Sequence, residues 1–533
     1  MAFIVDPPIA TKIAKMKERV RWQHPALAAR NIDQTRLILQ DGHADETEFS
    51  FLVIGDSGCG PRPDHHPQRR IAERMMPHLE DCRFLLHTGD VVYHAGSKEQ
   101  YLENFIKPYR EWLVGGDRPS HIDFDKMLFQ FPFLAVLGNH DYYNLPLVYS
   151  VLVQLLRPFR QLFGATLNPN VGWQGSRVGD IYARAFLDYL RTMPPDQLAR
   201  HLEAHYQPWD ATTQGLCYQP GQFTRLPNRY YTFRYGDLDF FALDSSTFND
   251  PAPLPNQVDS RAYRQWLANQ RTDIEQQRQT VVDEALHLKT TDPHAQERLG
   301  DLQAKIEQFD EMLLDIDKQI NADPTVTVDT EQLLWLKDRL IASWHDPSVR
   351  GRIVYFHHPP YVTEVTKWRQ GQTLAIRRNL RWVLDQVAEA VPAIDATHPP
   401  VNLVLNGHAH CFEYLRTVDT GHADSYIDWV VCGGSGLSLR RQRPEGAMLY
   451  ETFSGQAPDT PAEFRLVAKS QLFSGLTGHK TDRRRPYSFL RIDVKAGDSP
   501  QFVLTPYVSE RYHQDWQDYT LDPLVLNYPN PHG

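Results

Sequence analysis

Several short apolar runs along the chain end at a glycine or at a polar residue that can bind a metal ion. The runs at 51–54, 84–86, 133–137, 353–356 and 403–405 are followed by Asp56, Asp90, Asn139, His357 and His408, respectively. Runs of this length predict strands that are buried on both faces. Helical patterns separate several of them, so the sequence predicts an α/β layered fold. In such sheets functional residues gather beyond the carboxyl ends of the strands, which is where all of these polar residues fall.

Two long stretches, at 145–222 and 258–323, interrupt this alternation. The first begins with a helical pattern at 147–163. In the second, apolar residues recur every three or four positions from Leu299 to Ile320 and every seven positions downstream of Leu267. This spacing predicts two helices folded back as an antiparallel coiled-coil hairpin, with arms ~40 Å long. We favour a structural arm or a dimer contact for this hairpin over a lid that gates the substrate.

The composition narrows the class of protein. The chain has 533 residues and a formal net charge of -10, which argues against a protein that coats nucleic acid. Its five cysteines include no CxxC pair, so we expect no disulfide framework. Residues 1–20 lack the apolar segment of a signal peptide, and the apolar stretch at 142–156 is shorter than the ~20 residues of a membrane span. We therefore expect a cytoplasmic protein.

The polar residues at the strand ends belong to five blocks that could together form a metal site. They supply two carboxylates, a phenol, an amide oxygen and several imidazoles, which are the hard and borderline ligands that a dinuclear site needs. The adjacent glycines let the backbone turn sharply and approach a metal closely. The blocks are Gly55-Asp56-Ser57-Gly58, Gly89-Asp90-Val91-Val92-Tyr93, Gly138-Asn139-His140-Asp141, His357-His358-Pro359 and Gly407-His408-Ala409-His410.

In this order, the blocks resemble the motif series of the calcineurin-like metallophosphoesterase superfamily. The resemblance covers Asp56 to His410, and it implies a layered β-sandwich flanked by helices, with the predicted helical hairpin as an insertion. Most of the superfamily has Asp-x-His in the first block, whereas this chain has Asp56-Ser57-Gly58. The purple acid phosphatase branch shows the same loss and has a tyrosine in a Gly-Asp-x-x-Tyr block, where Tyr93 stands here. The resemblance therefore implies two metal ions, Fe(III) and a divalent ion (Fe, Mn or Zn).

The resemblance also implies a role for each motif residue. Asp90 would bridge the two metals, and Pro359 marks His357 rather than His358 as the ligand of its block. His140 would donate a proton to the leaving oxygen or stabilise its charge, and Asp141 would orient His140. The remaining metal ligands would be Asp56, Tyr93 and His410 at the first metal, and Asn139, His357 and His408 at the second.

The implied activity is hydrolysis of phosphoric esters by a metal-bound hydroxide. We expect phosphomonoesters of a small molecule or a protein as substrates. The motifs leave open a phosphodiesterase acting on cyclic nucleotides or nucleic acid. The basic runs 440–443 and 483–485 could then grip a phosphate chain, although a solvated surface is the plainer interpretation of them. A third hypothesis is a non-catalytic interaction protein that uses the hairpin. Because all seven expected ligands are present, we favour an enzyme, which the hairpin could join into a homo-oligomer.

The expected domain organisation follows from the extent of the motifs. Residues 1–45 would be an N-terminal extension, and 46–450 a metallophosphoesterase catalytic domain with insertions at about 145–222 and 258–323. Residues 451–533 carry strand-like runs and would be a C-terminal β-rich extension, which either adds to the sheet or forms a small cap.

Overall fold

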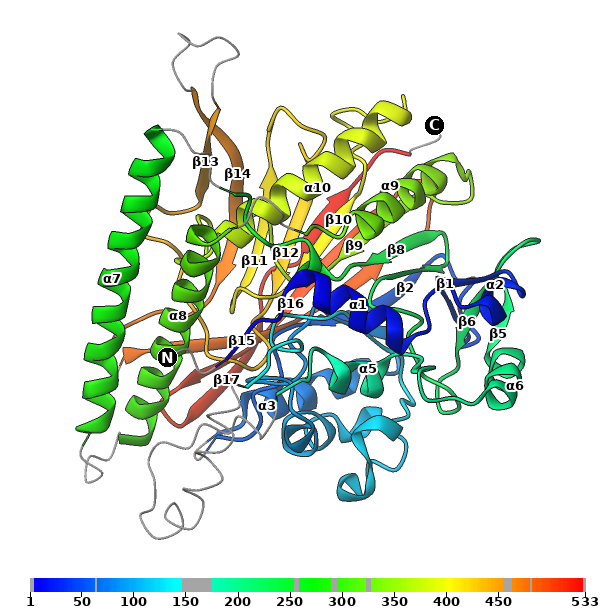
Figure 1. Cartoon of the computed structure of the whole chain (residues 1–533), viewed down its shortest axis with the longest axis horizontal. Coiled ribbons are helices and arrows are strands. Elements are labelled where there is room, and N and C mark those ends of the chain that lie inside the picture. Colours follow the sequence, from blue (N-terminus) through cyan, green and yellow to red (C-terminus); the bar gives the residue numbers. More distant parts are fainter. Residues whose placement is uncertain are drawn as a thin grey trace.

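Two β-sheets pack face to face at the centre of the computed structural model (Figure 1). The structure describes residues 4–530 except 63–64, 146–174, 254–257, 289–294, 323–326, 454–462 and 480–481. Within these residues, the first sheet has eleven strands in the spatial order β13 (Met448–Phe453), β14 (Glu463–Ser474), β11 (Phe412–Thr417), β12 (Asp428–Cys432), β10 (Leu403–Asn406), β9 (Gly351–Tyr355), β8 (Leu238–Ala242), β7 (Tyr231–Tyr235), β1 (Ile32–Leu39), β6 (Gln214–Tyr218) and β5 (Tyr206–Pro208). The second sheet has the order β17 (Asp515–Thr520), β16 (Gln501–Tyr512), β15 (Arg484–Val494), β2 (Phe49–Ile54), β3 (Cys82–His87) and β4 (Phe133–Ala135), and β18 (Leu524–Asn527) pairs with β16.

Helices flank the two sheets. The apolar faces of α9 and α10 pack on the eleven-stranded sheet, and α3 contacts β15 of the other sheet (Figure 1). Among the described residues, no helix is both long and apolar enough to cross a membrane. The helices are α1 (Ile9–Arg19), α2 (Pro25–Ala28), α3 (Pro67–Met75), α5 (Asp180–Phe186), α6 (Pro195–His205), α7 (Val258–Leu286), α8 (Ala295–Ile320), α9 (Thr330–His345) and α10 (Gly371–Ala390), with short helical turns at Met76–His78, Lys98–Gln100, Leu102–Ile106, Arg110–Trp112, Pro119–His121, Phe124–Lys126 and Ser245–Thr247.

The core between the sheets is rich in aromatic side chains. Phe84 on β3 meets Phe233 on β7 edge to face, with ring centroids 5.6 Å apart. Phe51 on β2 meets Phe240 on β8 in the same way, also at 5.6 Å. Each such ring buries a large apolar area, and edge-to-face pairs add to that stabilisation. The layered α/β fold, with a β-sandwich flanked by helices, is thus confirmed.

Parallel pairing brings the motif residues to one edge of the sandwich. Strands β2, β3 and β4 are mutually parallel neighbours in one sheet. Strands β8, β9, β10 and β12 are parallel neighbours in the other. The burial patterns of β2, β9 and β10 show no exposed position, as expected for strands covered on both faces. The loops that follow β2, β3, β4, β9 and β10 carry the five motif blocks.

Segments near both ends of the chain contribute strands to the two sheets. Strand β1 lies between β7 and β6 of the eleven-stranded sheet and is parallel to both. Strand β15 pairs antiparallel with β2, with Leu490 opposite Val53. The C-terminal runs therefore extend the sheets and do not form a separate cap. The division into an extension at 1–45, a catalytic domain at 46–450 and an extension at 451–533 stays a prediction.

The predicted helical hairpin is present as α7 and α8, which lie side by side (Figure 1). Arg271 of α7 pairs with Asp317 of α8 at 2.7 Å, and Arg278 pairs with Asp310 at 2.6 Å. The later residue of α7 thus pairs with the earlier residue of α8, so the two helices are antiparallel. Their shared apolar side chains are the predicted ones, Leu267, Ile274, Val281, Leu302, Phe309 and Ile316. A coiled-coil supercoil stays a prediction, and the helical pattern at 147–163 lies outside the described residues.

Candidate metal centre

The loops at the strand ends bring the candidate ligands together because their backbones turn tightly. Gly89 has a φ of +100°, which L side chains rarely adopt. A Cβ at Gly138 would lie 2.1 Å from Asp90 Oδ1, so only glycine lets the β4 loop approach this carboxylate. Asp56 and Asp90 themselves have positive φ angles of 53° and 56°. Non-glycine residues with such angles are uncommon and are often found at functional sites.

Three of the candidate ligands form a first group around a phenol. Tyr93 Oη lies 2.9 Å from Asp56 Oδ1 and 2.8 Å from Asp90 Oδ2. His410 Nε2 lies 3.6 Å from Asp56 Oδ1. All four side chains are buried. The structure therefore brings Asp56, Tyr93 and His410 together, with Asp90 beside them.

The other candidate ligands form a second group that shares Asp90 with the first. His357 Nε2 lies 2.9 Å from Asn139 Oδ1 and 3.2 Å from Asp90 Oδ2. The His408 ring is 5.0 Å from the His357 ring. Ligand atoms of Asp56, Asp90 and His357 all lie within 4.8 Å of one another, as metal ligands do. Asp90 is therefore the carboxylate at which the two groups meet.

Backbone carbonyls fix the orientation of the imidazoles. His357 Nδ1 lies 2.9 Å from the carbonyl oxygen of Thr88, and His410 Nδ1 lies 3.1 Å from that of Ser438. When Nδ1 donates to a carbonyl, the Nε2 lone pair of the ring remains available for a metal. In His358, by contrast, Nδ1 is 2.8 Å from Ser245 Oγ and Nε2 is 3.3 Å from Asn249 Nδ2. This difference favours His357 as the ligand.

The electrostatics of the cluster suit a cation. Burial, reinforced by the charge of nearby Asp90, raises the pKa of Asp56 to about 7. Burial also opposes ionisation of Asp90, but His357 and His140 outweigh it and hold the pKa of Asp90 below its usual value. Burial and the two neighbouring carboxylates raise the pKa of Tyr93 well above 10.0. Buried carboxylates next to a phenol need a positive partner, and the donor set fits hard or borderline metal ions.

His140 is held beside the metal ligands by its backbone and by its ring. Its backbone N–H donates to Asp90 Oδ1 at 2.8 Å. Its Nδ1 lies 2.6 Å from the carbonyl oxygen of His94, and its Nε2 lies 3.9 Å from Glu311 Oε1. Burial opposes the imidazolium form, but the charges of Asp90 and Glu311 outweigh it and raise the pKa of His140 above 6.5. This geometry suits a proton donor.

Asp141 has a different task from the one that the sequence suggested. Its carboxylate accepts backbone N–H groups from Gly138 at 2.9 Å, Asp90 at 3.0 Å and Val91 at 3.2 Å. The His140 imidazole is held by the His94 carbonyl instead. The expectation that Asp141 orients the His140 ring is therefore corrected: Asp141 ties the β3 and β4 loops together and so fixes the backbone beneath both ligand groups.

Helix α8 contributes to this site, which the sequence did not lead us to expect. Glu311 pairs with Lys367 at 2.9 Å, and Lys367 Nζ is 3.0 Å from His408 Nε2. Arg440 Nη1 donates to the carbonyl oxygen of Ala304 on α8 at 2.8 Å. A possible signal was a second series on α8, in which polar residues step by three and four beside the apolar stripe: Gln308, Glu311, Asp315 and Lys318.

The two basic runs also serve α8. Arg485 lies 2.8 Å from Asp301 of α8, and Arg483 pairs with the same carboxylate. Arg440, from the other run, is buried against the same helix. Both interpretations of these runs, a grip for a phosphate chain and a solvated surface, are thus replaced for these three arginines by a contact with the hairpin.

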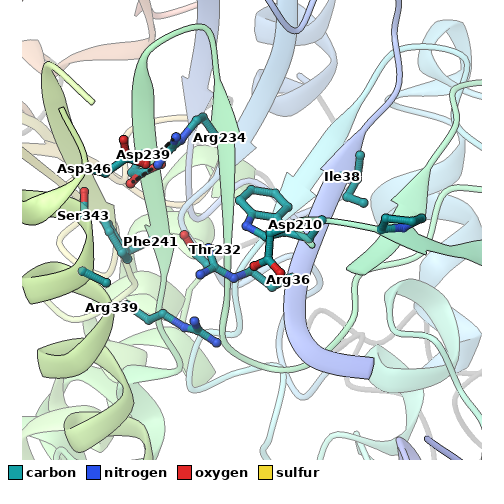
Figure 2. Close-up of a pocket in the computed structure, with 13 residues that line it drawn as sticks. Arg36, Ile38, Asp210, Thr232, Arg234, Asp239, Phe241, Arg339, Ser343 and Asp346 are labelled. Atoms are coloured by element: carbon teal, nitrogen blue, oxygen red, sulfur yellow. Dashed lines mark hydrogen bonds and ion pairs between the residues drawn. The ribbon is translucent and has the colours of Figure 1, made fainter. Parts of the chain in front are cut away.

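A separate pocket of about 510 Å³ lies between β1, β7, β8 and α9 (Figure 2). Arg234 in its wall pairs with Asp239 at 2.7 Å and with Asp346 at 2.9 Å. Arg339 pairs with Asp33. The residues that line this pocket include none of the predicted metal ligands. The arginines of this pocket are paired with carboxylates of the protein itself, so the residues at the strand ends are the stronger candidates for a catalytic site.

One comparison with known proteins bears on the site. Residues 49–282 match the sequence model of the calcineurin-like phosphoesterase family. That segment carries Asp56, Asp90, Tyr93, Asn139 and His140, and it confirms the family resemblance that the motif blocks indicated. The match supports metal-dependent hydrolysis of phosphoric esters. A search of curated protein sequences finds no match.

Solved structures with a similar chain path include three at 12% sequence identity. The inner membrane complex anchor GAP50 of Plasmodium has a TM-score of 0.35, over 91% of this chain and 90% of that one. The purple acid phosphatase PPD1 of yellow lupin (Lupinus luteus) has a TM-score of 0.37, over 91% of this chain and 54% of that one. PhoD has a TM-score of 0.38, over 92% of this chain and 72% of that one.

Proposed function

We propose that this chain hydrolyses phosphomonoesters at a dinuclear site that holds Fe(III) and a divalent ion (Fe, Mn or Zn). The observation that carries the proposal is the position of Asp90, whose carboxylate lies 2.8 Å from Tyr93 Oη and 3.2 Å from His357 Nε2. Asp56, Tyr93 and His410 would hold the first metal, with Asp90 as the bridge. Asn139, His357 and His408 would hold the second.

Each part of the chain has a defined task in this reaction. Bound metals supply Lewis acidity, which polarises the phosphoryl group and activates water. Asp141 keeps the β3 and β4 loops in register, and the Thr88 and Ser438 carbonyls hold the rings of His357 and His410. His140 protonates the leaving oxygen or stabilises its charge. The burial of these groups excludes bulk water and strengthens their electrostatic effects.

The phosphodiesterase is the second candidate, and the structure weakens its main support. Arg440, Arg483 and Arg485, which could have gripped a phosphate chain, contact α8 instead. We therefore favour a small monoester as the substrate. A cytoplasmic location and a homo-oligomer formed through the hairpin remain part of the proposal.

Metal content and turnover test the proposal together. We expect freshly purified protein to contain about two metal ions per chain, one of them iron, as two-metal phosphoesterases do. It should hydrolyse p-nitrophenyl phosphate faster than bis-p-nitrophenyl phosphate, and chelation should abolish both activities. Elemental analysis and turnover are measured on the same samples. Faster diester turnover would favour the phosphodiesterase. If the protein binds no metal and shows no turnover even after iron, manganese and zinc are added, the proposal of an enzyme is rejected.

The Tyr93→Phe substitution tests the iron site separately. Because burial and two carboxylates keep the Tyr93 phenol protonated, it should ionise only on a bound cation. A tyrosinate on Fe(III) gives a visible charge-transfer band, so native protein should be coloured and Tyr93→Phe colourless. Tyr143→Phe is the matched control, since Tyr143 is also buried but its hydroxyl accepts a hydrogen bond from Asn139 Nδ2 at 2.7 Å, whereas that of Tyr93 meets the Asp56 and Asp90 carboxylates. Colour that survives in Tyr93→Phe would show that another residue is the chromophore ligand.

A further inference from the structure

The polar side of α8 lies against the body of the protein, next to the candidate metal centre. Its carboxylates meet groups that ordinarily bind anions: an ammonium, a guanidinium and the free N–H groups at a helix N-terminus. The contacts are Asp301 with Arg485 at 2.8 Å, Glu311 with Lys367 at 2.9 Å, and Asp315 with the backbone N–H groups of Gly371 at 2.8 Å and Gln372 at 3.0 Å.

Glu311 is the carboxylate of this row that reaches the metal centre. Its Oε1 lies 3.9 Å from His140 Nε2, and its Oε2 lies 2.9 Å from Lys367 Nζ. The Glu311 side chain is only 11% exposed. An anionic group is thus buried at the place where the resemblance puts the leaving oxygen of a phosphoryl group. Carboxylate and phosphoryl oxygens accept the same hydrogen bonds from ammonium and imidazolium donors.

Lys367 joins Glu311 to a predicted metal ligand. Its side chain is 2% exposed, and its Nζ lies 3.0 Å from His408 Nε2. Gln372 Nε2 also lies 3.0 Å from the same His408 nitrogen, so two donors compete for one lone pair. An ammonium carries three N–H donors. Among the described residues, Glu311 is the one carboxylate within ion-pair distance of Lys367 Nζ, and an anion that entered the site could take its place.

Arg440 is an independent indication that an anion binds next to Lys367 and the candidate metal centre. Its backbone N–H donates to the carbonyl oxygen of His410 at 2.8 Å, so it lies next to the first ligand group. Its Nη1 is bound to the carbonyl oxygen of Ala304. Its Nη2 is buried, with no hydrogen-bond partner among the residues that the structure describes. A buried guanidinium N–H without an acceptor is costly and is usually satisfied by a ligand or water.

We propose, on the basis of the proposed function, that Lys367 is a substrate-binding residue that contacts the phosphoryl oxygens, and that Glu311 is the carboxylate which the substrate displaces. In the protein without substrate, Glu311 neutralises Lys367. When a phosphomonoester enters, its more highly charged phosphoryl group replaces Glu311 as the partner of the ammonium. Glu311 thereby selects for highly charged phosphoryl groups, because a phosphodiester has a lower charge and competes less well for the ammonium.

The proposal predicts opposite effects for the two members of the ion pair. Lys367→Met removes the ammonium, so inorganic phosphate should bind about 10- to 100-fold more weakly, the range expected for one charge-assisted hydrogen bond. Lys367→Arg, which keeps the charge, should restore most of the affinity. Glu311→Gln removes the competing anion, so phosphate should bind several-fold more tightly. A purely structural ion pair would instead lose affinity in both variants.

The measurement is a calorimetric titration of inorganic phosphate into metal-loaded protein, with the inhibition constant of phosphate against p-nitrophenyl phosphate as a second readout. Lys318→Met is the matched control, because Lys318 lies on α8 and, like Lys367, pairs with carboxylates, Asp6 at 2.6 Å and Asp250 at 2.9 Å. It should leave phosphate affinity unchanged. Unchanged affinity in Lys367→Met, or weaker binding in Glu311→Gln, would overturn the proposal. Absence of turnover in the wild type would overturn the proposed function alone, since the order of phosphate affinities still decides the role of Lys367.

Discussion

Replacement of Asp90 by asparagine should remove bound metal and lower turnover about 1,000-fold. Metal-ion stabilisation of the transition state is worth several kcal/mol, and each ~1.4 kcal/mol is a factor of ten in rate. Asparagine keeps the shape of the side chain and can still accept the His140 N–H that Asp90 Oδ1 accepts at 2.8 Å. What it lacks is the negative charge that both ligand groups share. Metal content by elemental analysis and turnover of p-nitrophenyl phosphate measure the two effects.

Thermal unfolding separates loss of metal from loss of fold. Asp90 lies beside the buried carboxylates of Asp56 and Asp141, and its charge raises the pKa of both. The interactions of Asp90 with His357 and His140 outweigh burial and hold the pKa of Asp90 below its usual value, so Asp90→Asn should moderately lower the Tm of the metal-free protein. Metals that bind only the native state raise its stability, so the Tm increase on metal addition should disappear in the variant.

Asp428→Asn is the matched control for Asp90→Asn. Asp428 is buried and accepts hydrogen bonds from Tyr414 Oη at 2.8 Å and Tyr528 Oη at 2.6 Å. It begins β12 and lies opposite Leu403, the first residue of β10, at the other end of the strands from the motif loops. Asp428→Asn should lower stability without changing metal content. Full metal occupancy and normal turnover in Asp90→Asn would show that Asp90 does not bridge the metals.

The sequence predicted the sandwich core well because its strands are covered on both faces. The run that ends before Asp56 is β2, and every residue of that strand is buried. A continuous apolar run reports burial directly, so it identifies the strand. The pairing of strands that are distant in the sequence leaves no comparable pattern of residues. Nothing in the run at 487–494 says that Leu490 lies opposite Val53, because many apolar strands would fit the same edge equally well.

The candidate ligands were predictable for a different reason. Each lies in the loop that follows a strand, and parallel pairing brings the carboxyl ends of neighbouring strands to one edge. Orientation within a loop was less predictable. Asp141 follows His140 in the chain, yet its carboxylate meets the backbone N–H groups of Asp90 and Gly138. Adjacent residues in a tight turn point in different directions, so neighbourhood in sequence does not imply contact between side chains.

The hairpin shows the same contrast between burial and docking. Heptad spacing predicted that Leu267 and Phe309 would be buried between two helices, because the period of the apolar residues indicates which side of each helix is buried. The place where α8 docks depends on polar contacts such as Glu311 with Lys367, which join segments 56 residues apart. A glutamate on a helix is usually solvated, so the polar series on α8 could indicate a second contact face but not that Glu311 lies at the metal centre.

His140→Ala should lower kcat by about 100- to 10,000-fold while both metals stay bound, which is the usual range for a lost general acid. The contact between His140 and Asp90 uses the His140 backbone N–H, at 2.8 Å, so it survives the substitution. The imidazole, by contrast, is aimed by the His94 carbonyl, with Nδ1 at 2.6 Å and Nε2 toward Glu311. Loss of the ring therefore removes the proton donor and leaves the metal ligands in place.

The dependence on the leaving group distinguishes a proton donor from a group that only shapes the site. p-Nitrophenolate leaves without protonation, whereas an alkoxide needs a proton, so His140→Ala should slow an alkyl phosphate far more than p-nitrophenyl phosphate. His201→Ala is the matched control, because His201 Nε2 also contacts a carboxylate, Asp188 at 2.8 Å, on a helix that bears none of the motif residues. It should change neither rate. If His140→Ala slows both esters equally, His140 stabilises charge rather than transferring a proton. If the variant loses metal, His140 helps to hold the metal ligands in place.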